Sequence, residues 1–293
     1  MSLLFTKRPD RFDYQASRTC RNCESVFQGK FCPRCGEKVV ESYERSVRYF
    51  ADDLLNALTS LDGKFITSLK MLLTNPGRMS ADIVAGKRVP YMRMVSLFFV
   101  ANFFYFLFPI FEAFNTSFNS QYSVQPYSSM IRPWVDARLA ATGTSIEAYA
   151  ETFNQQSSSN AKLLLVFIVF VFSWVLYLIN WKRKEYYADH LTLSFEFMSF
   201  TIFFPTLLMS TLLLVALKLA ALVGLDWSRL FYDEIISPVI LLFILYFFVR
   251  AQVTFYGASW LKAGLRSLLM FLGFAATMVA FRFALFLVTY WMA

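Results

Sequence analysis

Long apolar runs alternate with polar stretches along this chain of 293 residues, and the runs begin only after residue 93. Five of them contain hardly a charge, at residues 94–114, 163–181, 197–224, 235–249 and 268–292. A helix needs about 20 apolar residues to cross a bilayer. The pattern therefore predicts an all-α polytopic membrane protein with about five transmembrane helices in residues 94–293. The fourth run is short, so we expect its helix to continue past Arg250.

The first 93 residues have a different, amphipathic pattern. Apolar residues recur at spacings of three and four, at Val47, Phe50, Leu54, Leu58, Leu61, Phe65, Leu69 and Leu72. This periodicity predicts a helix with one apolar stripe. Asn75-Pro76-Gly77 should end it, and a short amphipathic piece follows at 79–85. We expect residues 39–93 to form cytosolic helices that lie on the inner membrane surface or against the cytoplasmic helix ends. A soluble helical hairpin that packs on itself is the alternative.

Two segments lack both patterns. Residues 1–19 form a polar lead without the apolar core of a secretory signal. Residues 114–160 are rich in Ser, Asn, Gln and Tyr, which favours an irregular external loop with little to bury.

Composition and charge then set the location. The chain is 57% hydrophobic, with 34 phenylalanines and a net charge of +8, which is more apolar than a soluble domain of this size. Lysine and arginine concentrate before residue 94, at 182–184 and at 250–266. Basic loops stay on the cytoplasmic side, so we expect a cytoplasmic N-terminus and an outside C-terminus. A nucleic-acid or anionic-ligand surface is the less favoured reading of this charge.

All four cysteines lie within residues 20–35, as Cys20-x2-Cys23 and Cys32-x2-Cys35. Two such pairs can enclose one metal ion, and four thiolates favour tetrahedral Zn²⁺. Because four sulfurs leave no open position, residues 20–38 are predicted to be a zinc ribbon with one structural ion. Val26, Phe27 and Phe31 are its few candidate core residues. A rubredoxin-like iron site, or redox dithiols or disulfides, are the alternatives.

Several motifs follow one another in an order that is more specific than any one of them. They are the two cysteine pairs, Asn75-Pro76-Gly77, Gly86-Lys87-Arg88-x2-Tyr91 and Tyr187-x2-His190. Together they resemble a bacterial domain-of-unknown-function family of polytopic membrane proteins with an N-terminal zinc ribbon. The resemblance implies a bacterial inner-membrane location and no established activity.

Few polar residues fall within the apolar part of the chain. Tyr187, His190 and Glu196 could form a polar cluster at the inner mouth of the bundle, although a lone histidine is more often structural. Arg282 lies deep in the last run and needs an acceptor. Glu112 is the acidic residue best placed for an ion pair, with Asp226 or Asp233 as alternatives, and an anion site is the competing reading.

Three further residues have structural interpretations. Asn102 should form an interhelical hydrogen bond, and Gly257 and Gly273 should be turn or packing positions.

No recognisable catalytic constellation is visible in the sequence, so we expect no enzyme. The first functional hypothesis is a docking, scaffold or regulatory protein of the lipid bilayer, with a protein partner on the cytosolic side. The second is a transporter, channel or lipid-handling protein with a regulatory ribbon. Nucleic-acid binding is less favoured, despite the ribbon's basic residues Arg18, Arg21, Lys30, Arg34 and Lys38.

Overall fold

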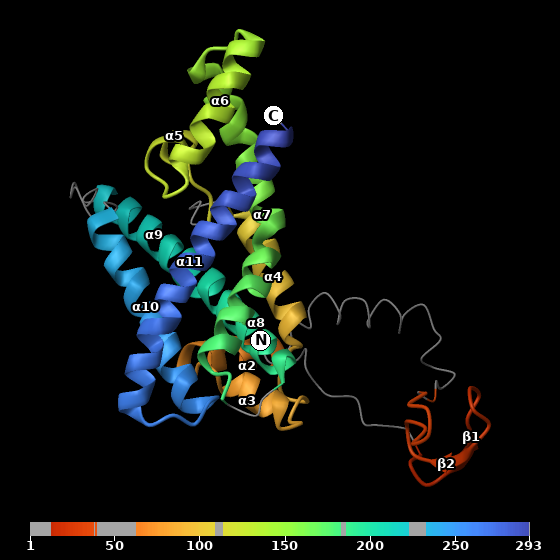
Figure 1. The fold of residues 1–293 in the computed structure, drawn as a ribbon. Helices are drawn as coiled ribbons and strands as arrows, with labels where there is room; N and C mark the ends of the chain where they lie inside the picture. Colours follow the sequence, from red (N-terminus) through yellow and green to blue (C-terminus); the bar gives the residue numbers. More distant parts are fainter. Residues whose placement is uncertain are drawn as a thin grey trace. The chain divides into compact units, whose positions relative to one another are not determined.

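The computed structural model describes residues 13–37, 39, 63–108, 114–182, 186–222 and 233–292, with side chains from 237 onward in the last segment. The chain divides into two compact units, Met1–Asp62 and Gly63–Ala293. The first holds the small red module with two strands in Figure 1, and the second holds all of the described helices.

The first unit contains a small cysteine-bearing module built on one short hairpin. Strands β1 (Ser17–Thr19) and β2 (Val26–Gln28) pair antiparallel, with Arg18 opposite Phe27. The hairpin therefore starts before Cys20, earlier than the predicted boundary. Phe27 is buried with Cys20 and Cys32, whereas Val26 and Phe31 are exposed. The expectation that all three apolar residues form the core was wrong: Val26 precedes Phe27 on β2 and points to the opposite face, and Phe31 lies beyond the end of that strand.

The second unit is predominantly helical. Its shorter helices are α2 (Gly63–Thr74), α3 (Arg78–Val84), α4 (Met94–Leu107), α5 (Phe118–Ser123) and α6 (Ser128–Thr142). Its longer elements are α7 (Ile146–Ile179), α8 (Tyr187–Thr201), the π-helix η2 (Ile202–Leu208), α9 (Met209–Leu222), α10 (Asp233–Thr254) and α11 (Trp260–Met292).

Four helices in the described residues are long and apolar enough to cross a membrane: 146–179, 187–222, 237–254 and 260–292. Helix α4, the first predicted span, has 14 residues, or about 21 Å of helix at 1.5 Å per residue, less than a hydrocarbon core of about 30 Å. A count of five thus stays a prediction. The expected continuation of the fourth run past Arg250 is confirmed, because α10 ends at Thr254.

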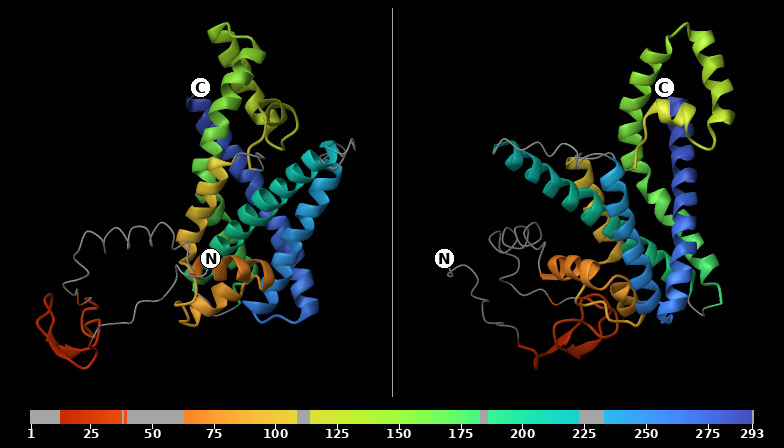
Figure 2. Two further views of the ribbon diagram at one scale, coloured as in Figure 1. Left: turned by 180° about the vertical axis from the view of Figure 1, so that it is seen from behind. Right: turned by 90° about the vertical axis from the view of Figure 1, so that its left-hand side faces the viewer.

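The segment predicted as an irregular loop is largely helical, which corrects that prediction. It forms α5, α6 and the first turns of α7, capped by Ser117 and Ser145 at the starts of α5 and α7. These elements bury a small second core with the end of α11 (Figure 2, right). Polar residues are tolerated there because they are paired: Ser157 donates to Asn115 (2.8 Å), and Asn160 donates to Thr289 (3.2 Å).

Helices α8, η2 and α9 run on as one element from Tyr187 to Leu222, with Pro205 inside the π-helix. Proline has no N–H to donate to the Thr201 carbonyl four residues earlier. The Thr206 hydroxyl donates to that carbonyl instead, at 3.0 Å. The break in the regular ladder is therefore satisfied internally, as a membrane span requires.

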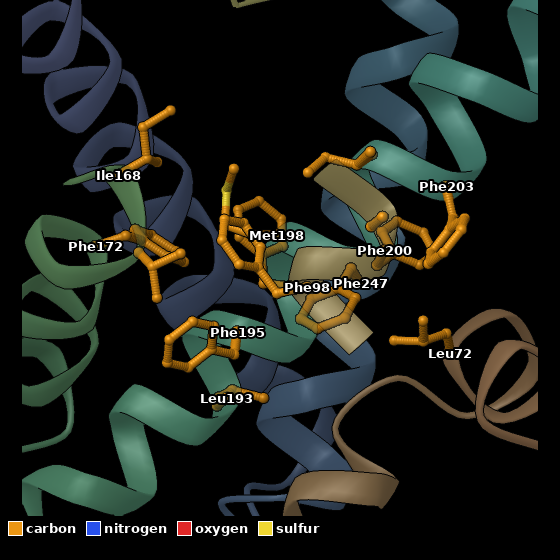
Figure 3. Close-up of a cluster of buried hydrophobic side chains, with 14 of the residues drawn as sticks. Leu72, Phe98, Ile168, Phe172, Leu193, Phe195, Met198, Phe200, Phe203 and Phe247 are labelled. Carbon is orange, nitrogen blue, oxygen red and sulfur yellow. The ribbon is translucent and has the colours of Figure 1, made fainter. Parts of the chain in front are cut away.

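The main core lies where α4, α7, α8, α10 and α11 meet, and phenylalanines dominate it (Figure 3). Phe172 packs on Phe197 and Phe274 with ring centroids 4.9 and 5.3 Å apart. Leu72 and Met79, from α2 and α3, are fully buried in this same core. These two helices therefore pack against the bundle and are not a self-contained hairpin.

The three structural interpretations made for Asn102, Gly273 and Gly257 are confirmed. Asn102 on α4 donates to the Lys162 carbonyl on α7 at 3.2 Å, as an interhelical hydrogen bond. A Cβ at Gly273 would lie 2.2 Å from the Val175 side chain, so this glycine lets α11 approach α7 closely. Gly257 has a φ of +60° in the turn between α10 and α11.

Candidate functional site

The four cysteine side chains come together in one cluster. Their sulfur atoms all lie within 4.8 Å of one another, and the four residues could hold a metal ion. Cys20 and Cys35 are 3.5 Å apart and Cys23 and Cys32 are 3.6 Å apart, sulfur to sulfur. Sulfurs at about 2.3 Å from a tetrahedral zinc would be separated by roughly 3.8 Å. The spacing fits one tetrahedral ion, and all four thiols are free of disulfides.

Both cysteine pairs are held by the same backbone turn. In the first, the Glu24 N–H donates to Cys20 O and the Cys20 N–H to Ser25 O; in the second, Gly36 N–H donates to Cys32 O and Cys32 N–H to Glu37 O. Glu24 and Gly36 both have a positive φ, at 59° and 79°. A glycine at position 36 is a visible signal for such a turn, whereas nothing in the sequence marks the matching turn at Glu24, since glutamate rarely adopts this conformation.

Ser25 adds a polar contact beside the sulfurs. Its hydroxyl lies 3.1 Å from the Cys23 sulfur and 3.2 Å from the Cys32 sulfur. This hydrogen bond lowers the pKa of the Cys32 thiol to about 6. The thiolate is the form of cysteine that binds a metal ion.

A second site surrounds Glu196, which is completely buried on α8. Its Oε1 accepts from the Gly77 N–H at 2.8 Å, and its Oε2 accepts from the Ser80 N–H at 2.9 Å and from the Ser80 hydroxyl. The carboxylate therefore caps the first turn of α3 from a different helix. Three donors therefore tie this carboxylate to the α2–α3 corner.

Helix α10 holds the same corner from the other side. Tyr246 donates to the Leu73 carbonyl (2.8 Å), Arg250 to the Asn75 side chain (2.6 Å) and Thr254 to the Pro76 carbonyl (2.6 Å). We call Asn75-Pro76-Gly77 with these partners and Glu196 the corner site. Tyr246 and Thr254 satisfy the Leu73 and Pro76 carbonyls, which the end of α2 would otherwise leave unpaired, and Arg250 satisfies the Asn75 side-chain oxygen.

Gly77 is required at this corner for two reasons. Its φ is +79°, where an L side chain is strained. A Cβ there would also lie 2.7 Å from the Thr254 hydroxyl oxygen and 2.8 Å from the Ala251 Cα. The backbones of α3 and α10 approach too closely for any side chain.

The Gly86-Lys87-Arg88-x2-Tyr91 motif closes the other end of α3. Gly86 has a φ of +90°, and the Tyr91 hydroxyl donates to Asp82 at 2.7 Å. Burial and this carboxylate raise the pKa of Tyr91 to about 12. The tyrosine thus stays protonated and holds the segment that enters α4.

Tyr187, His190 and Glu196 do not share one hydrogen-bonded cluster. Tyr187 pairs with Ser173 at 2.7 Å, and buried His190 pairs through Nδ1 with Tyr256 at 2.7 Å. Tyr187 and His190 are linked through an aromatic contact, because the Tyr177 ring packs against both side chains. Glu196 lies nine residues after Tyr187, on the opposite side of α8, and its carboxylate meets the start of α3 instead.

The predicted Arg282–Glu112 ion pair stays a prediction, since Glu112 and Asp226 lie outside the described residues, as does the Asp233 side chain. Arg282 interacts electrostatically with Tyr127, and its Nε finds no partner in the described part of the chain. Lys218 is exposed on α9.

Sequence reasoning missed Ser80, Tyr246, Arg250 and Thr254 as parts of the corner site. The turn itself was visible in Asn75-Pro76-Gly77, but its partners on α8 and α10 are more than 100 residues away. Nothing local marks them.

These features define a helical protein with several helices suited to crossing a membrane and a cysteine cluster suited to a metal ion. Residues 62–106, which contain α2, α3 and nearly all of α4, match a family described as a protein of unknown function (DUF3667). The match thus covers the corner and leaves out the cysteine motif, so the resemblance to a family of unknown function is confirmed only for this segment. No curated protein and no solved structure matches the chain.

Proposed function

We propose that this chain is a non-enzymatic protein of the bacterial inner membrane, with a cytoplasmic N-terminus and an outside C-terminus. Its zinc module docks a protein partner on the cytosolic side. The zinc is structural, because four sulfur ligands complete its coordination and leave no position for a substrate.

The observation that carries this proposal is the exposed apolar surface of the module. Val26 is 71% exposed and Phe31 is 59% exposed, while Phe27 is buried beside the cysteines and Val39 is partly buried against them. A module this small gains stability by burying apolar residues. Two large apolar side chains that stay exposed to solvent favour a contact surface for a partner. The rigid turns at both cysteine pairs would present that surface with little loss of entropy on binding.

The experiment compares complexes purified in mild detergent from the native cells. The full chain should retain a stoichiometric protein partner, and Val26→Ser with Phe31→Ser should lose it while keeping the metal. Arg21→Ser is the matched control, because Arg21 is exposed on the same module and its loss leaves the apolar surface intact. If the double variant retained the partner and Arg21→Ser lost it, docking through this surface would be refuted.

The alternative function is a transporter, channel or lipid-handling protein with a regulatory ribbon. The π-helix at Pro205 favours it, because interruptions of this kind in membrane helices often mark functional sites. Solute flux by the purified chain in liposomes, without any partner, would support this function over docking.

A further inference from the structure

A polar pocket of about 470 Å³ opens between the end of α7 and the turn that joins α10 to α11. Its walls come from two connections that are distant in sequence. The lining residues are Ile179, Asn180, Trp181, Lys182, Gly257, Ala258, Ser259, Lys262 and Arg266.

Three of these side chains are cations. Lys182 and Lys262 are exposed at the rim, and Arg266 is partly buried. The Arg266 Nη1 atom is buried without a hydrogen-bond partner in the described part of the chain. No acidic residue occurs among the described residues that line the pocket. A buried guanidinium nitrogen without an acceptor is costly, so the pocket is chemically incomplete as it stands.

The start of α11 adds to the positive field. The Ala263 N–H donates to the Ser259 carbonyl, so Ser259 is the N-cap residue of this 33-residue helix. The N–H groups of the following turn have no acceptor within the helix and carry partial positive charge. The turn at Gly257 brings this helix start to the same pocket as Lys182.

We propose that this pocket binds a phosphate-bearing anion, and that its source is the headgroup of an anionic phospholipid. Exposed Trp181 borders the pocket, and Trp260, Leu261 and Leu265 are exposed on the adjoining turns of α11. Tryptophan prefers the membrane interface, and leucines beside the headgroup would contact the acyl chains. Basic pockets between helices are suited to such headgroups.

Retention of basic loops on the cytoplasmic side does not explain this site. That bias needs only charge near the helix ends. It requires neither a pocket nor a guanidinium nitrogen buried within it.

The test is binding of short-chain phosphatidylglycerol to the purified full chain in neutral detergent. Phosphatidylcholine of the same chain length and inorganic phosphate at equal ionic strength are the comparisons, and the shift in melting temperature is followed at each concentration. Phosphatidylglycerol should stabilise the protein at concentrations at least tenfold lower than phosphatidylcholine. Comparable stabilisation by inorganic phosphate would identify free phosphate as the source and still support the pocket.

Variants decide whether the pocket is responsible. Lys262→Gln and Arg266→Gln should each weaken binding about tenfold, the loss of one charge-assisted hydrogen bond. Lys262 is exposed, so its change should not impair folding. Lys87→Gln is the control, because it removes the same charge from an exposed residue outside the lining. Equal binding of both lipids, or an equal loss in Lys87→Gln, would overturn the proposal.

Discussion

At the scale of single residues, one carboxylate and one glycine decide how the Asn75-Pro76-Gly77 turn packs. Glu196 supplies the acceptors that the start of α3 lacks, and Gly77 leaves the space that α10 occupies. Each acts through a partner from a distant part of the chain. Single substitutions at these residues should therefore be more costly than their size suggests.

Replacing Glu196 by alanine should strongly destabilise the helical unit. The Gly77 N–H, the Ser80 N–H and the Ser80 hydroxyl would be left buried without acceptors. The expected loss in the free energy of unfolding is about 3–5 kcal/mol. Glu196→Gln should lose roughly 2–3 kcal/mol, because its amide turns a donor toward a donor. Unfolding in detergent measures both. Glu147→Gln, at an exposed position on α7, should stay within about 1 kcal/mol, and a Glu196→Gln protein of unchanged stability would contradict the capping role.

Gly77→Ala should destabilise the protein more than Gly86→Ala does. Both glycines have positive φ, but a Cβ meets Thr254 and Ala251 only at Gly77, whereas at Gly86 nothing lies within 4 Å. The left-handed conformation alone costs an alanine about 1–2 kcal/mol, and overpacking at Gly77 should add about 1–3 kcal/mol. Chemical unfolding of the two variants side by side gives the comparison. Equal losses would mean that the close approach contributes nothing.

At the scale of elements, the helical unit and the cysteine module have different means of holding together. Helices α7 and α11 meet where Gly273 faces Val175, as small residues permit in membrane helices. The metal module has one short hairpin and one buried phenylalanine. We therefore expect the helical unit to depend on packing and the cysteine module to depend on a bound ion.

Gly273→Ala should weaken the α7–α11 contact by about 1–3 kcal/mol, because its Cβ would lie 2.2 Å from Val175. Val175→Ala in the same chain should recover most of that loss, which a double-mutant cycle of thermal unfolding measures. Gly264→Ala is the matched control on α11: nothing lies within 4 Å of its Cβ, and alanine is the better helix former by about 1 kcal/mol. Additive effects of Gly273→Ala and Val175→Ala would exclude their contact.

Cys32→Ser, or a strong chelator, should remove the metal and unfold residues 20–38 while the membrane helices stay folded. The module folds around its ion, and the helical unit has its own core. Elemental analysis should find one zinc per chain before the change, and proteolysis within the module should follow its loss. Arg34→Ser, between the same two cysteines, should keep the metal. A metal-free native protein, or a Cys20–Cys35 disulfide on isolation, would refute the site.

At the scale of the whole molecule, the number of spans decides which parts share a side of the membrane. The four long helices meet the length requirement, and α4 is the short one. With five spans the two termini lie on opposite sides, and with four they lie on the same side. The positive charge at 182–184 favours the first arrangement.

Reporter fusions should therefore read cytoplasmic at Lys38 and Lys184, and outside at Asn119 and Ala293. The basic segments that precede α4 and follow α7 support this orientation. Enzymatic reporters active on only one side of the membrane make the measurement. Cytoplasmic readings at both Asn119 and Ala293 would instead mean that α4 does not cross.

The sequence by itself determined what depends on near neighbours in the chain. The spacing of Cys20, Cys23, Cys32 and Cys35 brings four sulfurs together through two local turns. Apolar run length predicted the long helices, and Asn75-Pro76-Gly77 marked the end of α2. Hydrophobicity and turn chemistry act within a few residues, so each of these could be read directly.

Tertiary structure alone decided which partner each polar group meets. Ser157 and Asn160 looked like loop residues, yet they lie in a helix because Asn115 and Thr289 pair with them. Glu196 was expected near His190 but caps α3. A buried polar group must find an acceptor or donor wherever the fold brings one. For these residues that partner lies many positions away, so only the folded arrangement of helices determines it.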